Sequence, residues 1–241
     1  MAIIAKSSGN GDGVAYSPIP AGNYVARCYS MIDLGTREEE ILGQKKVVHK
    51  VRITFELPTE LKVFNPEKGE QPCVISKEFT LSMNEKANLR AFLTSWRGKA
   101  FTDEEASAFD VTKLLGVPCL LNIIHKQGRK DPSKVFDEIA SATPIPKGMV
   151  CPPQVNPTFE FSINEFDQAK FESMPNFLQE KIKGSDEYKA LTKPAAPQYT
   201  KAQQEAMLSE EHYKKMMMMA TSSPSHPMSL NDSSDDLDLP F

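Results

Sequence analysis

The chain has 241 residues, with 28 Lys and Arg, 32 Asp and Glu, and a net charge of −4. This length allows one or two domains, and a hydrophobic fraction of 40% is enough for a modest core. The four cysteines have no zinc-finger spacing, and we see no signal peptide and no apolar run of membrane-spanning length. We therefore expect a cytoplasmic protein without a metal, a cofactor or a membrane anchor.

The charge is unevenly distributed along the chain. Residues 14–150 contain 19 Lys and Arg against 17 Asp and Glu, whereas residues 151–241 contain 8 against 14. The acidity therefore belongs to a C-terminal appendage. It does not argue against a polyanionic partner for the first segment.

A strand-rich pattern follows a Gly- and Ser-rich arm over residues 1–15. In residues 45–57, KKVVHKVRITFEL, apolar side chains alternate with polar ones, which is typical of a half-buried antiparallel strand. Further strands are expected over residues 24–34, 73–82, 116–125 and 135–142, with Ile32 of the first facing inward. A helix is expected from Glu85 to about Arg97 with Asn84 as its N-cap, and Thr102 with Glu105 matches a capping box.

The order strand, strand, strand, helix, strand, strand is that of the OB-fold, a five-stranded Greek-key barrel. We therefore expect a mainly β protein with this barrel over residues 16–150, and an open α+β sheet is the alternative. In OB-folds the connections after strands one and four flank the nucleic-acid groove. The second of these, KQGRKDPSK, is basic, but the first contains Glu38, Glu39 and Glu40 and does not suit a polyanion.

The C-terminal part has a different character. Residues 151–200 combine a Pro-rich linker with a short amphipathic helix over Pro175–Lys183, expected to brace the barrel or to dock on a partner. Residues 201–219 suggest a weak helix within the segment 201–241. The last 22 residues lack Lys and Arg, are Ser-rich and should be disordered.

The final seven residues, DDLDLPF, combine three aspartates with a Leu-Pro-Phe sequence, which could fill an apolar pocket rimmed by cations. This tip resembles the acidic tip of bacterial and phage single-stranded DNA-binding proteins. The segments YVARCYSMIDLGT, VRITFELPTEL and LLGVPCLLNI are similar to a phage-encoded group of this type. The resemblance implies that the barrel coats single strands in phage replication, recombination or repair. It also implies that the tip recruits partner enzymes through Asp235, Asp236, Asp238, Leu239, Pro240 and Phe241.

Single-strand binding needs cations for phosphates and aromatic rings for bases. From strand parity and the basic turn we predict a nucleic-acid surface made of Arg27, Tyr29, Lys50, Arg52, Lys77, Phe79, Lys126, Arg129, Lys130 and Lys134. Trp96 and Phe136 are weaker stacking candidates, since Trp96 lies on the apolar stripe of the helix. Phe79 is at least as consistent with a core position, and His49 is expected to be a hydrogen-bonded core residue.

Two other functions compete with this one. A replication adaptor would use the same barrel and tip without touching DNA, and the nearly neutral barrel favours it. An enzyme is not supported, because we find no P-loop, nucleophile elbow or metal-binding pair. The sequence leaves the oligomeric state open, and a homo-oligomer remains an option.

Overall fold

A computed structural model of the chain describes residues 18–41, 43–128, 131–193 and 201–220. It divides into two compact units, residues 1–193 and 194–241. In the second unit the structure describes one helix, α6 (Lys201–Ala220), over the segment where a weak helix was predicted. No helix in the described residues is both long and apolar enough to span a membrane.

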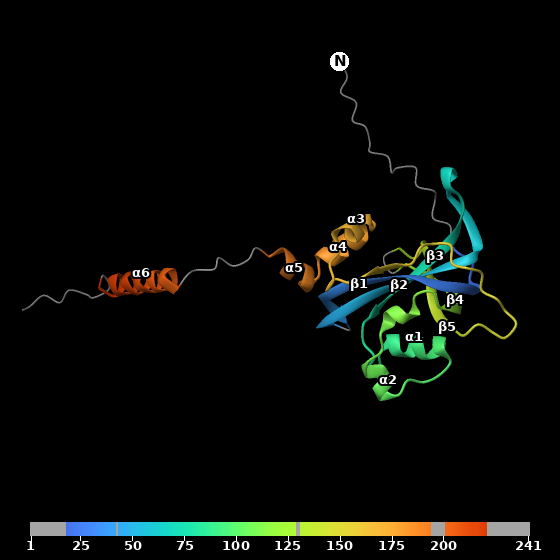
Figure 1. Cartoon of the computed structure of the whole chain (residues 1–241), viewed down its shortest axis with the longest axis horizontal. Coiled ribbons are helices and arrows are strands. Elements are labelled where there is room, and N and C mark those ends of the chain that lie inside the picture. Colours follow the sequence, from blue (N-terminus) through green and yellow to red (C-terminus); the bar gives the residue numbers. More distant parts are fainter. Residues whose placement is uncertain (1–17, 42, 129–130, 194–200, 221–241) are drawn as a thin grey trace, which may run out of the picture. The chain divides into compact units, whose positions relative to one another are not determined.

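The first unit is built on one curled, mainly antiparallel sheet that forms a half-barrel (Figure 1). Its strands are β1 (Gly22–Ile41), β2 (Gln44–Asn65), β3 (Gly69–Thr80), β4 (Pro118–Gln127), β5 (Val135–Thr143) and the short β6 (Phe159–Phe161). They run in the order β3-β2-β1-β4-β5, and β6 pairs in parallel with residues 30–32 of β1. The mainly β prediction is confirmed, and all five predicted strands are present.

The acidic stretch after the first predicted strand is part of a hairpin. β1 continues through Gly35 to Ile41 and pairs with the start of β2, which corrects the prediction of a polar connection. Glu38 forms an ion pair with Lys45, and Glu39 forms one with Lys50, both at 2.8 Å. Opposite charges on neighbouring strands stabilise such a pairing. The glutamates therefore compensate lysines of the same hairpin.

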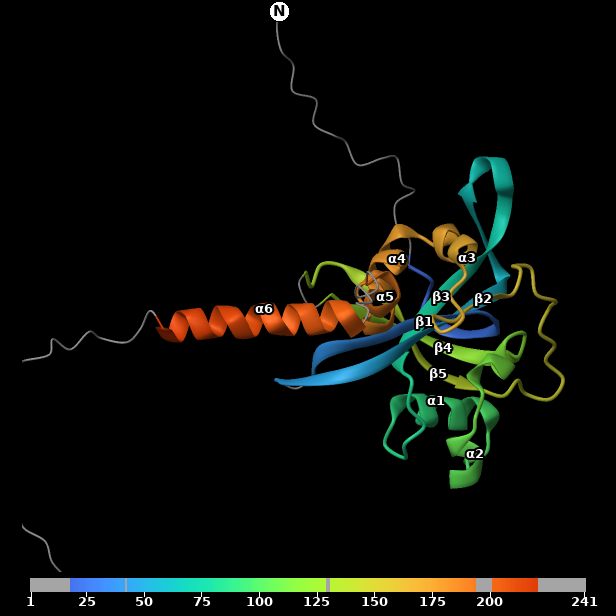
Figure 2. The same cartoon turned by 60° about the vertical axis from the view of Figure 1, so that its left-hand side comes forward.

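β2 and β3 extend beyond the half-barrel as a hairpin arm, which Figure 2 shows projecting from the sheet. The predicted loop over residues 59–72 is this arm, and its turn contains the 3-10 helix η1 (Pro66–Lys68). The register shifts between Leu57 and Leu61. Pro58 is tolerated inside β2 because such a bulge spares it from donating to the ladder.

The concave side of the sheet holds the main core. Val51, Ile53, Phe55 and Leu57 face inward as predicted, and they pack with α1 (Asn88–Arg97). Trp96 is 4% exposed, and its indole N–H donates to the Pro118 carbonyl at 3.1 Å, so the core interpretation of this ring is confirmed. The capping box of Thr102 and Glu105 begins α2 (Asp103–Ser107), which is followed by the 3-10 helix η2 (Val111–Leu114).

The convex side, which we call the outer wall, carries a second apolar cluster. A β-bulge between Cys28 and Ser30 reverses the alternation of β1, so Ile32 faces outward and not inward as predicted. Ile32 and Leu34 pack under α3 (Gln168–Ser173), α4 (Asn176–Lys183) and α5 (Asp186–Thr192). Figure 1 shows these helices and α1 on opposite sides of the sheet. The predicted amphipathic helix is confirmed, and it packs on its own sheet.

Candidate nucleic-acid interface

The predicted nucleic-acid residues fall into three places. Arg27, Tyr29 and Arg52 belong to the outer wall. Lys50, Lys77 and Phe79 line a hollow at the edge strand β3. We call the boundary between the edge strands β3 and β5, which Lys77 bridges, the seam. Lys126 and Lys134 belong to the β4–β5 hairpin, whereas Arg129 and Lys130 lie outside the described residues.

Arg27 holds the chain's own linker. Its guanidinium donates to the carbonyls of Gly116 at 2.6 Å, Pro152 at 3.0 Å and Cys151 at 3.4 Å. One strand away, the fully buried carboxylate of Glu56 accepts from the backbone N–H groups of Val155 and Asn156 at 2.8 Å each. These contacts fix residues 151–156 against the outer wall, where the DNA backbone was expected.

Arg52 is engaged in the same way. Its guanidinium lies 3.0 Å from Glu78 and 5.4 Å from the centre of the Phe177 ring on α4. Lys181 of α4 reaches Glu78 at 2.5 Å. Burial alone would raise the pKa of Glu78, but the hydrogen bonds and charges of Lys181 and Arg52 outweigh it and lower that pKa. Arg52 therefore helps to dock α4.

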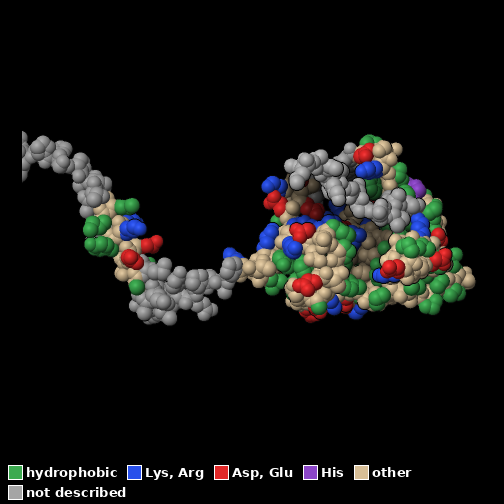
Figure 3. Space-filling view, turned by 90° about the horizontal axis from the view of Figure 1, so that it is seen from above, with side chains coloured by type: hydrophobic (Ala, Val, Ile, Leu, Met, Phe, Trp, Pro, Cys, Tyr) green, Lys and Arg blue, Asp and Glu red, His purple; other side chains and the backbone are tan. Residues whose placement is uncertain are grey.

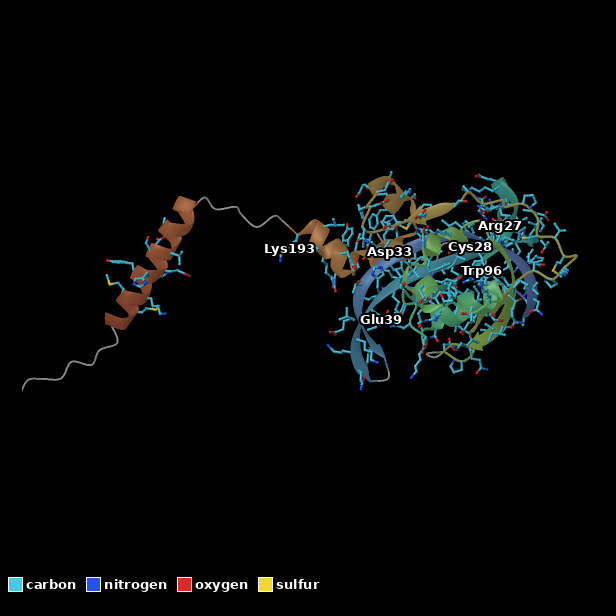
Figure 4. All side chains as sticks on the ribbon, turned by 60° about the horizontal axis from the view of Figure 1, so that its bottom comes forward. Arg27, Cys28, Asp33, Glu39, Trp96 and Lys193 are labelled. Atoms are coloured by element: carbon cyan, nitrogen blue, oxygen red, sulfur yellow. The ribbon has the colours of Figure 1, made fainter. Side chains whose placement is uncertain are left out.

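Arg27 and Lys50 also lie far apart along the sheet. In the β1–β2 ladder Arg27 is opposite Glu56, whereas Lys50 is opposite Gly35. Eight residues separate Arg27 from Gly35, which is about 26 Å along an extended strand. Figure 4 likewise places Glu39, the partner of Lys50, on the hairpin away from Arg27. Arg27 and Lys50 therefore lie at separate places along the sheet.

Tyr29 sits near the bulge in β1 and is half-buried. Burial raises the pKa of its hydroxyl, and the charge of Glu56 raises it further, whereas Arg52 opposes the shift. Tyr29 therefore lies near the charged side chains of Glu56 and Arg52 on the outer wall. Glu56 and Arg52, whose charges act on this hydroxyl, contact the linker and α4 respectively.

Lys77 and Phe79 lie on the inward side of β3, away from the face that carries Arg52, and the core alternative for Phe79 is confirmed. Lys77 is opposite Ile53 of the core, and Phe79 is only 3% exposed. The Phe79 ring packs 4.9 Å from Phe92 between centroids, so its faces are covered in this conformation.

Lys77 bridges the seam. No backbone ladder joins β3 to β5 in the described part of the chain, but the Lys77 ammonium donates to the Ile139 carbonyl on β5 at 2.5 Å. It also lies 5.7 Å from the centre of the Phe79 ring. Burial lowers the pKa of Lys77, with Glu138 opposing the shift and Lys126 adding to it. Lys77 and Lys126 are therefore close enough to repel each other.

A hollow opens at the β3 edge, next to the seam. Lys50, Lys77 and Lys86 line it with the hydroxyl and amide groups of Thr80, Ser82, Asn84 and Asn88. Lys86 was not predicted, since it lies in the loop before α1. The helix begins at Asn88 and not at Glu85, because residues 84–87 form a turn in which the Ala87 N–H donates to the Asn84 carbonyl. The signal in the sequence that could have pointed to Lys86 is Ala87, because its side chain cannot cap the helix that follows.

The β4–β5 hairpin presents a cation beside an aromatic ring. Lys126 is opposite Phe136 in the ladder, and the Phe136 side chain is 48% exposed. Lys126 pairs with Glu138 at 2.8 Å, and Lys134 lies 3.9 Å from Asp131. The space-filling view in Figure 3 likewise shows Lys and Arg side chains interspersed with Asp and Glu on the face it presents.

His49 is an electrostatic clamp on α5, which corrects its predicted core position. Its Nε2 lies 2.6 Å from Asp33 Oδ1, and its Nδ1 lies 3.7 Å from Glu187 of α5. Glu187 also accepts hydrogen bonds from the backbone and hydroxyl of Thr36. The hydrogen bond to Asp33 raises the pKa of His49, and the Asp33 and Glu187 charges raise it further against the effect of burial.

The cysteines Cys28, Cys73 and Cys119 are buried and free, as small apolar residues would be. Burial raises the pKa of the Cys28 thiol to about 12. No cluster of His, Cys, Asp or Glu able to hold a metal ion occurs among the described residues. The tip residues 235–241 lie outside the described residues.

Comparison with protein-family models, with curated proteins and with solved structures gave no match to this chain.

Proposed function

We propose that the protein binds single-stranded DNA through the seam side of its half-barrel. The half-barrel would be a partly open OB-fold, since its strand order and the position of α1 between β3 and β4 match that topology. The chain would be a member of the phage-encoded group that its sequence resembles. Its role would lie in replication, recombination or repair.

The observation that carries the proposal is the convergence of lysines on one opening. Lys50, Lys77 and Lys86 share a hollow, Lys77 reaches across the seam to Ile139 of β5, and on the β4–β5 hairpin the exposed Phe136 ring stands opposite Lys126. Single-strand binding has two requirements, which are cations that neutralise phosphates and an aromatic face on which bases stack. Nearby carboxylates such as Glu138 would lower affinity and favour weak, salt-sensitive contacts.

The acidic tip, Asp235–Phe241, would recruit partner enzymes in this proposal. The support is its sequence, in which aspartates give long-range attraction and Leu239, Pro240 and Phe241 offer an apolar anchor. Deleting residues 235–241 should leave DNA binding unchanged or stronger and abolish partner recruitment. Loss of DNA binding itself would contradict this division of labour.

A protein-interaction adaptor is the second candidate. The hairpin arm favours it, because Leu61, Val63 and Phe64 are each at least 48% exposed there. Apolar side chains gathered on one exposed element are typical of protein–protein contacts.

The test is a fluorescence anisotropy titration of the full chain with labelled oligo-dT and with a duplex of equal length. Neutralising three to five phosphates on a single strand predicts a slope of log affinity against log salt of about −2 to −3.5. The proposal expects oligo-dT to bind more tightly than duplex with such a slope. Absence of oligo-dT binding at low salt would leave the adaptor as the better account.

A further inference from the structure

The hollow at the β3 edge gathers positive charge from three separate elements. Lys50 comes from β2, Lys77 from β3 and Lys86 from the loop before α1, around a cavity of about 440 Å³. One carboxylate, Glu78, also lines the cavity. Arg52 and Lys181 already compensate its charge. The cavity wall is therefore cationic.

The start of α1 forms part of the same wall. Ala87 and Asn88 line the cavity, and Ala87 occupies the N-cap position without a side chain that could accept a hydrogen bond. The first turn of this ten-residue helix contains no acidic residue. Its backbone N–H groups and the positive end of its dipole are thus left without the carboxylate that usually compensates them.

The three lysines differ in how far the chain itself satisfies them. Lys50 pairs with Glu39 at 2.8 Å, and Lys77 donates one hydrogen to the Ile139 carbonyl, which leaves two. Lys86 is exposed, and we find no ion pair for it within the described ranges. Burial already lowers the pKa of Lys77, so an anion beside it would relieve an unfavourable charge.

We propose that this hollow, formed by Lys50, Lys77 and Lys86 at the start of α1, binds one phosphate group. A phosphate offers several acceptor oxygens, which suits lysine ammonium groups and helix N–H groups that approach from different sides. This inference rests on the proposed function, which makes the group a backbone phosphate of bound single-stranded DNA. A free phosphate compound would have the same chemistry.

Two variants separate phosphate binding from folding. Lys86→Ala removes the ammonium group that the chain does not pair, and Lys147→Ala is its matched control, an exposed lysine outside the hollow. Ala87→Asp places a carboxylate at the N-cap, where the extended backbone at φ −75° and ψ 134° suits a capping residue. This change should raise the melting temperature and also repel a phosphate, so damage to the fold could not explain weaker binding.

The experiment titrates the full chain and its three variants with labelled oligo-dT, and in parallel with inorganic pyrophosphate by calorimetry. We expect Lys86→Ala and Ala87→Asp each to weaken oligo-dT binding roughly three- to tenfold, with Lys147→Ala unchanged. If Ala87→Asp lowers the melting temperature, the comparison of Lys86→Ala with Lys147→Ala decides whether the hollow binds a phosphate group.

The outcomes distinguish this inference from the proposed function. If the wild-type chain binds oligo-dT and both hollow variants bind it equally well, the phosphate site is wrong and the function stands. If the wild type ignores oligo-dT but binds pyrophosphate, and Ala87→Asp loses that binding, the function is wrong and the hollow is a site for free phosphate compounds. Binding of neither probe overturns both.

Discussion

The outer wall and the seam use the same types of side chain in opposite ways. On the outer wall, Arg27 donates to linker carbonyls and Arg52 pairs with Glu78 beneath Phe177. At the seam, Lys86 stands exposed and Lys77 keeps two hydrogens beyond its bond to Ile139. Lys50 and Lys126 also pair with carboxylates, Glu39 and Glu138, so Lys86 and the remaining hydrogens of Lys77 are the positive groups most available to a polyanion.

The greatest loss of stability is expected from weakening the packing of α4 on the outer wall. Ile182 of α4 is fully buried in the second apolar cluster, so Ile182→Ala should cost about 3–4 kcal/mol of unfolding free energy. Urea denaturation measures it. Leu191→Ala on α5, at a site 59% exposed, is the control and should change stability by less than about 0.5 kcal/mol. Equal effects would mean that the cluster is not packed as described.

Glu56→Ala removes the carboxylate that holds residues 155 and 156 by three hydrogen bonds of 2.8 Å. We expect a loss of about 2–3 kcal/mol and faster proteolysis of the linker, since its N–H groups lose a buried acceptor. Limited proteolysis with mass spectrometry checks the site of cleavage. Glu70→Ala on the hairpin arm is exposed and should behave as wild type; unchanged cleavage in Glu56→Ala would contradict the role of Glu56.

Two phenylalanines of similar exposure test which surface of the half-barrel binds DNA. Phe136 at the hairpin is 48% exposed, and Phe177 on the outer wall is 52% exposed. Phe136→Ala should weaken oligo-dT binding by about 1–2 kcal/mol through lost base stacking, whereas Phe177→Ala should not weaken it. Anisotropy titrations measure both, and the reverse ranking would move the interface to the outer wall.

The smallest effect concerns the clamp on α5. Because the folded-state pKa of His49 is raised, its contribution to stability is complete below the unfolded pKa of about 6.5 and is lost as the pH rises through the folded value. We expect His49→Gln to remove a contribution of under about 1 kcal/mol from the pH profile of urea denaturation. His212→Gln on the exposed face of α6 should leave that profile unchanged. A profile of His49→Gln identical to wild type would rule out the clamp.

Local patterns in the sequence predicted much of this fold. The alternation in residues 45–57 identified the inward side of β2 from Val51 to Leu57, although Val47 is exposed and Val48 buried against it. The capping box identified α2, and the apolar stripe identified Trp96 as core. Each of these signals depends on residues close together in the chain. They were therefore readable without the tertiary structure.

Contacts between distant segments could not be read in this way. The bulge beside Tyr29 reverses the side chains of β1 as far as the second register shift, between Asp33 and Gly35, and no residue type in the sequence indicates either shift. Arg27 meets acceptors more than one hundred residues away, so its role in holding the linker was hidden. Lys86 becomes a candidate binding residue only in the folded chain, where it lines the same hollow as Lys50 and Lys77.

The most direct test of the central claim is hydrogen–deuterium exchange of the full chain with and without a saturating oligo-dT. The account predicts new protection at residues 77–90 and in the β4–β5 hairpin, with no change at residues 151–156 or in α4. Protection confined to residues 151–183, with none at the seam, would contradict it and place the bound strand on the outer wall.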